Sequence, residues 1–299
     1  MKKSFLHKVL IVSFIFGSCF ADSVQIKGSD TLVNLVQKLS EVYMKKHPDA
    51  NISVSGGGSG TGIAALINGK TDIADASRLM KDKELAKCKS KGMDVRQVVI
   101  AVDALSIIVN DSNPITSLSM EQIAAIYKGD VTNWADVGGP NKIITLYGRQ
   151  PSSGTFDFIR EHVLNGEYSD KMNQMNGNAQ IVEAVMHDEG GIGYVGVAYA
   201  TKGGTKPLNG LKILKVSATN GGITYSPLDE NMIYSGKYPI VRGLNQYLSG
   251  KPKGLVKTFI QFELSDEGQK IVADEGFYPL KGDFLKKNEK LFDTKVKFF

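Results

Sequence analysis

Cysteine is scarce in this chain: its 299 residues contain two, Cys19 and Cys88. A disulfide framework is therefore excluded, because removal of an N-terminal leader would leave Cys88 alone. The four histidines fall in no metal-binding spacing such as HExxH, and no GxSxG elbow is present. We expect no metal, no cofactor and no enzymatic activity.

Charge of one sign is also lacking. The chain has 36 Lys and Arg against 31 Asp and Glu, a formal charge of +5, of which three lysines in residues 1–21 contribute +3. The body of the chain is thus nearly balanced and has no long basic run. Since nucleic-acid binding needs a basic footprint, we expect no nucleic-acid partner.

Long hydrophobic runs are absent after residue 21, so we expect no membrane-spanning segment there. Within 1–21, lysines precede an apolar run at 9–16 and then small residues, which is the layout of a secretory signal peptide. We predict cleavage after Ala21 and an exported, periplasmic protein. In the alternative, the GSC sequence at 17–19 resembles a lipobox, and Cys19 carries a lipid anchor.

What the chain does contain is an alternation of short apolar runs with helical patterns, which predicts an α/β fold. Apolar residues at helical spacing predict a helix from Leu32 to Tyr43, and Ser119 with Gln122 predicts a capping box for another, ended by Gly129. Two lobes would have to be joined by strands, at 95–109 and 238–243. Strands are predicted at 23–27, 51–55, 95–109, 142–147, 192–197, 211–216 and 238–241.

Three clusters of Gly, Ser and Thr stand between a predicted strand and a predicted helix, at 28–31, 56–62 and 152–155. A helix N-terminus presents unpaired N–H groups and a partial positive charge, so each cluster can hold part of an anion. A single cluster of this kind is more often only a helix cap or a tight turn. Three of them can converge at the carboxyl ends of parallel strands.

Two arginines stand beside these clusters. Arg149 lies four residues before Ser153, and Arg78 follows Ser77 at another predicted strand exit. Arginine suits bidentate pairing with a tetrahedral oxyanion. Each can equally be a surface cation that pairs with an acidic residue.

In this order and spacing the motifs resemble those of the phosphate-binding periplasmic proteins, the PstS-like substrate-binding components of bacterial phosphate ABC importers. The resemblance covers nearly the whole chain after residue 21. The motifs that carry it are GSDT at 28–31, SGGGSGTG at 55–62, DIADASR at 72–78, SMEQIAAIYKGDVTNWADVGG at 119–139, GRQPSSGTF at 148–156 and GGIGYVGVAYA at 190–200.

The resemblance implies a two-lobed binding protein of the second structural type, with mixed, mostly parallel sheets and two crossover strands. Lobe I would comprise 22–104 and 234–299, and lobe II 105–233. A monomer would bind inorganic phosphate between the lobes and deliver it to membrane permease subunits. Alternatives are a receptor for sulfate, molybdate or tungstate and an exported phosphatase. We expect the C-terminal segment 286–299 to pack on lobe I.

The resemblance also implies which residues hold the phosphate. From lobe I it selects the first and second clusters with the DIADASR segment, and from lobe II Arg149 with the start of the following helix. The implied phosphate-binding residues are Ser29, Asp30, Thr31, Leu32 (through its backbone), Ser59, Gly60, Thr61, Ser77, Arg78, Arg149, Ser153, Gly154 and Thr155.

Two positions depart from the better-known members of the family. Ser77 stands where those members have an Asp that accepts a proton from phosphate, so the acceptor here is Ser77, Asp30, Asp75 or a group not visible in the sequence. Pro151 stands where they have an Asp that pairs with the arginine. Arg149 is then either freer to bind the anion or differently oriented.

Overall fold

The computed structural model of this chain describes residues 23–288. The predicted signal peptide, with Cys19, lies outside the described residues, and so does the C-terminal segment from 289 onward. Among the helices of residues 23–288, none is long and apolar enough to traverse a bilayer.

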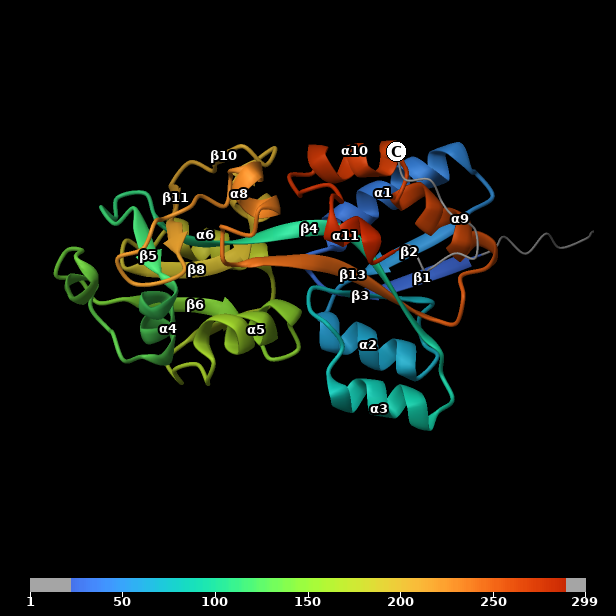
Figure 1. Cartoon of the computed structure of the whole chain (residues 1–299), viewed down its shortest axis with the longest axis horizontal. Coiled ribbons are helices and arrows are strands. Elements are labelled where there is room, and N and C mark those ends of the chain that lie inside the picture. The colour runs from blue at the N-terminus through green and yellow to red at the C-terminus, as the bar shows by residue number, and fades with distance from the viewer. Residues whose placement is uncertain (1–22, 289–299) are drawn as a thin grey trace, which may run out of the picture.

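Two groups of elements lie at opposite ends of two long strands, β4 (Val95–Asn110) and β13 (Val241–Ser249) (Figure 1). Lobe I contains β1 (Ser23–Gly28), α1 (Val33–Lys46), β2 (Asn51–Ser55), α2 (Ser59–Ile67), β3 (Ile73–Ala76), α3 (Asp82–Ser90), α9 (Gly254–Glu263), α10 (Asp266–Asp274) and α11 (Asp283–Lys286). Lobe II contains β5 (Ser117–Ser119), α4 (Met120–Lys128), β6 (Thr145–Arg149), α5 (Gly154–Ile159), β7 (Asn173–Met175), α6 (Asn178–Met186), β8 (Gly191–Gly196), α7 (Val197–Ala200), β9 (Thr201–Lys202), β10 (Lys206–Pro207), β11 (Leu211–Ile213), β12 (Lys215–Ser217) and α8 (Glu230–Tyr234).

One sheet runs through both lobes, in the order β2-β1-β3-β13-β4-β8-β6-β7, with β11 also paired to β4. In this sheet, β1 pairs in parallel with β2 and β3, and β6 pairs in parallel with β7 and β8. The short strands β9 and β10 of lobe II pair antiparallel. The crossing strands run antiparallel to their neighbours. The mixed α/β sheet with two crossover strands is therefore confirmed, while the predicted residue boundaries of the lobes stay a prediction.

β4 belongs to both lobes. Its first part, Val95 to Ala104, pairs with β13, and its second part, Leu105 to Val109, pairs with β8. Every residue of β4 from Val98 onward is buried. Apart from Asp103, Ser106 and Asn110 this buried stretch is apolar, which is typical of a strand that is covered on both faces.

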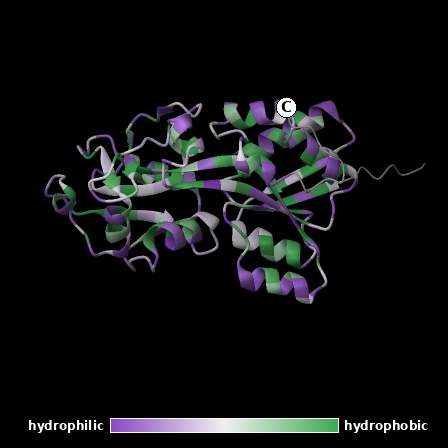
Figure 2. Ribbon diagram, viewed as in Figure 1, coloured by the Kyte–Doolittle hydropathy of each residue, from purple (hydrophilic) through white to green (hydrophobic). Residues whose placement is uncertain are grey.

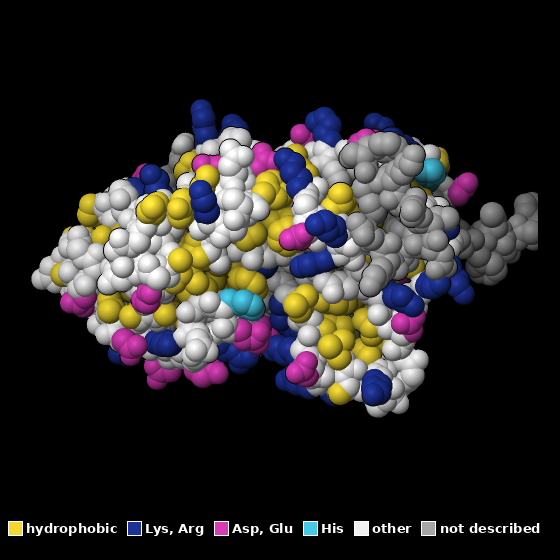
Figure 3. All heavy atoms as spheres, in the orientation of Figure 1, with side chains coloured by type: hydrophobic (Ala, Val, Ile, Leu, Met, Phe, Trp, Pro, Cys, Tyr) yellow, Lys and Arg dark blue, Asp and Glu magenta, His cyan; other side chains and the backbone are white. Residues whose placement is uncertain are grey.

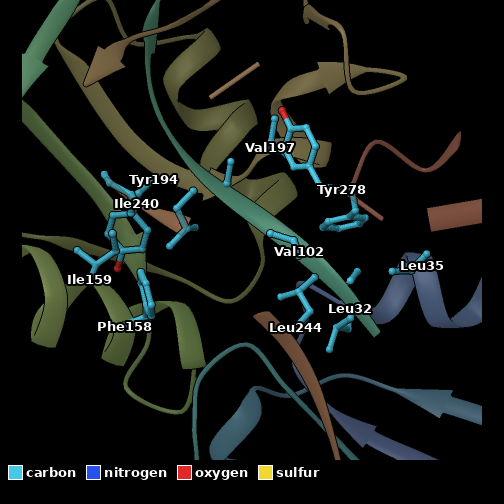
Figure 4. Packing of buried hydrophobic residues seen from close by; sticks show 14 of the residues in the cluster. Leu32, Leu35, Val102, Phe158, Ile159, Tyr194, Val197, Ile240, Leu244 and Tyr278 are labelled. Carbon is cyan, nitrogen blue, oxygen red and sulfur yellow. The ribbon is translucent and has the colours of Figure 1, made fainter. Parts of the chain in front are cut away.

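The hydrophobic core continues along β4 from one lobe into the other. Figure 4 shows Leu32 and Leu244 of lobe I, Val102 on β4 and Tyr194 of lobe II in this cluster. The covering helices carry hydrophobic and hydrophilic stripes (Figure 2), as expected for helices with one buried face. On the face that Figure 3 shows, acidic and basic side chains are interspersed over both lobes.

The two helix predictions are confirmed. Leu35, Leu39 and Tyr43 form the buried face of α1. At the start of α4, Gln122 N–H donates to Ser119 Oγ and Ser119 N–H donates to Gln122 Oε1, which is the predicted capping box. Gly129 caps the helix end in the left-handed conformation, with φ of 86°.

Three strand predictions need correction. The predicted strand 211–216 is two strands, because the chain leaves β4 after Ile213 and pairs with β5 from Lys215. Residues 142–144 are not in a strand, because Lys142 and Ile144 hydrogen-bond to the loop around the buried Trp134. The strand predicted at 238–241 begins at Val241. The strand exit predicted at Ser77 is the end of β3, for which no bounds were predicted.

Two buried carboxyl groups face each other in lobe I, Asp75 on β3 and Glu263 on α9. Gln246 lies between them on β13 and donates to Glu263 Oε1 at 3.0 Å. Burial raises the pKa of Asp75 to about 8 and that of Glu263 well above its usual value, while Gln246 lowers both. Burial therefore favours the protonated form of both carboxyls in the folded protein.

This pair makes stability pH-dependent. Between the unfolded pKa of Asp75 near 4 and its folded pKa of about 8, the folded state binds more protons than the unfolded state. The free energy of unfolding of the wild type should then fall as pH rises, by up to about 1.4 kcal/mol per pH unit for one such group. An Asp75→Asn variant should lose less stability from pH 5 to pH 8, as measured by denaturant unfolding.

Asp49→Asn is the matched control, because Asp49 is exposed on the turn before β2. Its pH dependence should equal that of the wild type. If Asp75→Asn and the wild type lose the same free energy of unfolding across this range, Asp75 is ionised in the folded protein and the interpretation is wrong.

Candidate anion-binding site

Three strand-to-helix turns of lobe I meet at one edge of the sheet. The first follows β1, and its Ser29 N–H donates to the carbonyl of Asp75 at 2.9 Å. The second precedes α2, where Gly58 N–H donates to the carbonyl of Gly28 at 2.8 Å. At the third, after β3, Ser77 N–H donates to Ser59 Oγ at 3.0 Å. Hydrogen bonds among neighbouring turns thus hold the first half of the site.

Glycine is required for this close approach. Gly28 has φ of 148°, and a Cβ there would lie 2.1 Å from the carbonyl oxygen of Asp75. A Cβ on Gly62 in α2 would lie 2.2 Å from the carbonyl oxygen of Lys27. Any side chain at either position would force β1 away from its neighbours, so these glycines permit the turns to converge.

Lobe II contributes the turn from β6 into α5. Ser153 is the N-cap of α5, and its Oγ accepts from the N–H groups of Thr155 at 3.2 Å and Phe156 at 3.4 Å. Ser153 and Thr155 are both buried. The sequence cluster at 152–155 therefore caps α5, and the first turn of this helix points toward lobe I.

The two halves touch. Thr31 Oγ1 lies 3.3 Å from Thr155 Oγ1, and Gly60 N–H donates to the carbonyl of Ser152 at 3.0 Å. A Cβ on Gly154 would lie 2.3 Å from Ser59 Oγ. The structure therefore brings together hydroxyl groups from both lobes in a closed arrangement.

Arg149 is buried at the end of β6 and reaches across to lobe I. Its Nη2 donates to Asp30 Oδ2 at 2.5 Å and to the carbonyl of Asn176 at 2.8 Å. Asp30 Oδ1 in turn accepts from Gly57 N–H at 2.8 Å. Asp30 thus supplies the carboxylate partner that is missing at Pro151, and it does so from the opposite lobe.

Arg78 lies beside the same interface. It forms a two-pronged ion pair with Glu84, each bond 2.8 Å long, and its Nε lies 3.0 Å from Asp157 Oδ2 of lobe II. Lys81 Nζ also reaches Asp157 Oδ2, at 2.6 Å. Arg78 is thus held in an ion-pair cluster between the lobes, and its direct contact with an anion stays a prediction.

The remaining predicted positions lie differently. Thr61 is exposed, and its hydroxyl donates to the carbonyl of Gly57 at 2.8 Å. Leu32 N–H donates to the carbonyl of Ser29 at 3.0 Å. The Asp75 side chain faces Gln246 and Glu263 in the lobe I core rather than the clustered hydroxyls.

Sequence reasoning missed three residues at the site. Asp103 and Arg242 lie on the crossing strands and form a fully buried ion pair at 2.8 Å. Tyr199 OH donates to the backbone carbonyl of Asp30 at 2.7 Å. A usable signal existed for two of them, because Asp103 and Arg242 are lone charges in apolar runs predicted to cross between the lobes.

Hydrogen-bond donors dominate the chemistry of this arrangement. The N-termini of α2 and α5 face each other, and hydroxyls of Thr31, Ser59, Ser77 and Thr155 lie between them. This set suits an oxyanion that accepts several hydrogen bonds. Across residues 23–288 there is no group of three or more His, Cys, Asp and Glu side chains arranged to bind a metal ion.

Cys88 takes no part in the site. It is buried in α3, and burial raises the pKa of its thiol. Glu84 raises the pKa further, and Lys91 only partly opposes this effect. The thiol is therefore not activated.

Comparison with known proteins agrees with this geometry. Residues 17–267 match a family model described as a PBP superfamily domain. The phosphate-binding protein PstS of Pseudomonas aeruginosa strain PAO1 is 33% identical over 87% of this chain and 84% of its own length. The protein of the same name from Staphylococcus epidermidis strain RP62A is 34% identical over 87% of this chain and 80% of its own length.

Solved structures are similar as well. A phosphate ABC transporter substrate-binding protein of Clostridium perfringens with bound phosphate superposes with a TM-score of 0.76 at 28% identity, over 87% of this chain and all of that chain. An ABC-type phosphate transport receptor of Vibrio cholerae gives a TM-score of 0.69 at 25% identity, over 86% of this chain and all of that chain.

The contact of Gly154 with lobe I yields a prediction. A Gly154→Ala variant places its Cβ against Ser59 Oγ and Ser77 Oγ, at 2.3 and 2.7 Å in the present geometry, so the lobes should close less completely. Spin labels at exposed positions 83 and 167, one per lobe, should report longer distances than in the wild type when phosphate is present.

Gly177→Ala is the matched control, since a Cβ there meets nothing within 4 Å. This variant should keep the short wild-type distances. The same short distances in Gly154→Ala would show that the interface adapts and that Gly154 does not control closure.

Proposed function

This chain belongs to the PBP superfamily and, within it, to the PstS-like phosphate-binding proteins, and on that premise we propose that it binds inorganic phosphate between its lobes and delivers it to a membrane ABC importer. The observation that carries the proposal is the meeting of the Thr31, Ser59 and Ser77 turns with the N-terminus of α5. Each side supplies donors that an oxyanion can accept.

Closure of the receptor follows from the same contacts. The lobes we propose are 22–104 with 234–299, and 105–233. Between them run the Thr31 to Thr155 hydroxyl contact, the Arg149 to Asp30 ion pair and the Arg78 to Asp157 ion pair. A phosphate bound by donors of both lobes adds to these contacts and shifts the population toward the closed form.

The proton acceptor for phosphate is Ser77 in our proposal. Asp30 is occupied by Arg149 and Gly57, and Asp75 faces the lobe I core. Ser59 Oγ and Ser153 Oγ already accept from backbone N–H groups, whereas among the described residues no N–H group donates to Ser77 Oγ. Ser77 Oγ can therefore accept a hydrogen bond from a protonated phosphate oxygen.

A receptor agrees with the site better than a phosphatase does. Activation of a Ser or Thr nucleophile needs a general base within hydrogen-bond reach. In the part of the chain that the structure describes, no histidine bonds to these hydroxyls, and Asp30 is held by Arg149. Turnover of a chromogenic phosphate ester would favour the enzyme instead.

The proposed function also requires a location outside the cytoplasm and a membrane partner. We propose that the protein is exported, acts as a monomer and docks on membrane permease subunits after closure. Support comes from the relatives, which are named as phosphate-binding and transport components, and from the leader pattern at 1–21. Lipid attachment at Cys19 is the alternative for the N-terminus.

The primary test is calorimetric titration of phosphate into the protein after unfolding and refolding, which strips carried-over ligand. The wild type should bind phosphate in excess sulfate. An Arg149→Ala, Ser153→Ala double variant should bind at least about a hundredfold more weakly, because it loses a charged group and a helix cap. Arg96→Ala should bind like the wild type, because Arg96 is a half-buried residue of β4 that pairs with the exposed Asp94.

Unchanged affinity in the double variant would refute the assignment of the site. Equal competition by sulfate would instead show that the fold is correct and the ligand is another oxyanion, with molybdate and tungstate to be titrated next.

Selectivity provides a separate prediction for Ser77. Ser77→Ala should lower phosphate affinity by about tenfold while sulfate affinity changes less, because the acceptor for the phosphate proton is lost. Competition titrations of phosphate against sulfate measure both. Equal losses for the two anions would show that Ser77 is a donor only.

A further inference from the structure

Arg242 and Asp103 form a buried ion pair where the two crossing strands lie side by side. The residues are direct neighbours in the register of β13 and β4. Arg242 Nε and Nη2 donate to Asp103 Oδ2 at 3.0 and 2.8 Å. Arg242 is 4% exposed and Asp103 is 0% exposed. No solvent screens this pair.

The rest of the guanidinium faces the candidate site. Nη1 donates to the backbone carbonyl of Ser77 at 2.9 Å, and Nη2 lies 3.4 Å from Thr31 Oγ1. The guanidinium carbon lies 5.5 Å from the centre of the Phe158 ring in α5. Arg242 therefore contacts two turns of lobe I and the first helix of the lobe II half-site.

Asp103 completes the arrangement from the other side. Its Oδ1 accepts from Val197 N–H at the start of α7 in lobe II, at 3.2 Å. The bond from Val197 thus holds the Asp103 carboxylate in place, and the carboxylate in turn holds the guanidinium of Arg242. Burial lowers the pKa of Arg242, and the Asp103 carboxylate opposes that effect, so the arginine stays charged.

The contact with Thr31 directs a proton. A hydroxyl has one proton to donate, and Arg242 can only donate. When Arg242 occupies a lone pair of Thr31 Oγ1, the Thr31 proton points elsewhere, toward Thr155 Oγ1 at 3.3 Å or toward an anion between the lobes. Thr31 thereby becomes an oriented donor.

We propose that Arg242, held by Asp103, is a positioning residue for phosphate: it orients the Thr31 hydroxyl and places the Ser77 turn from the crossing strands. This inference rests on the proposed phosphate binding. Strand pairing does not depend on the ion pair, because β13 pairs with β4 along its whole length from Val241 to Ser249. A buried pair is moreover weak evidence for a purely stabilising role.

A double-variant cycle on phosphate affinity tests the proposal. Arg242→Gln should weaken phosphate binding by about tenfold or more, and Thr31→Val should do the same. If Arg242 acts through Thr31, replacing Arg242 in the Thr31→Val protein should weaken binding by clearly less than it does in the wild type. Calorimetry gives the four affinities, and melting temperatures without phosphate report stability separately.

Arg242→Lys separates positioning from charge. Lysine keeps a cation beside Asp103 but lacks the planar fork that reaches Ser77 and Thr31 together. This variant should keep a melting temperature close to the wild type and still bind phosphate several-fold more weakly. Arg96→Gln, at the half-buried arginine on β4 that pairs with Asp94, is the matched control and should leave affinity unchanged. Should Arg242→Gln not fold, Arg242→Lys decides by its affinity.

Wild-type phosphate affinity in a folded Arg242→Lys protein would overturn the proposal. Fully additive losses in the double variant would overturn it as well, since they would show that Arg242 does not act through Thr31. A wild-type protein that fails to bind phosphate would be a different result, because it would refute the proposed function itself.

Discussion

Hydrogen-bonding groups that are buried between two lobes must find partners once water is expelled, and this constraint governs the structure. The closest hydroxyl pairs across the site are long, 3.3 Å for Thr31 with Thr155 and 3.4 Å for Ser59 with Ser77. Bonds of this length satisfy these groups weakly. An oxyanion with several lone pairs would satisfy them better, and on this ground we propose that ligand binding and lobe closure are coupled.

The same constraint explains how a nearly neutral protein can hold an anion. Each arginine near the site has a carboxylate partner: Arg149 has Asp30, Arg242 has Asp103, and Arg78 has Glu84 with Asp157. Local charge is therefore balanced before a ligand arrives. In the proposed site, neutral N–H and O–H donors at the starts of α2 and α5 then bind the anion.

The crossing strands connect the two lobes. β4 is a single strand that pairs with β13 in lobe I and with β8 in lobe II, and its side chains lie in one core shared by both lobes. Away from the site, Tyr278 OH donates to the carbonyl of Pro227 and Lys281 pairs with Glu230. At the site, the polar contacts between the lobes are those of Thr31 with Thr155, Arg149 with Asp30 and Arg78 with Asp157. Opening can thus break those contacts while the strands and the core stay intact.

Local features could be predicted from sequence because their causes lie within a few residues. Glycine and serine at 56–62 and 152–155 predict the strand-to-helix turns, Ser119 with Gln122 predicts a helix cap, and the apolar run at 95–109 predicts a crossing strand. Each depends on backbone conformation, capping or burial pattern. These features identified the fold and most of the hydroxyl donors.

Contacts between distant segments were decided by tertiary structure alone. Arg149 pairs with Asp30, 119 positions away, and Arg242 reaches Asp103, 139 positions away. Nothing local selects these partners; the packing of the lobes does, because a buried charge must pair with whichever opposite charge the fold brings near. The sequence by itself determined which groups can bind an anion, and the tertiary structure decided which charges neutralise one another around it.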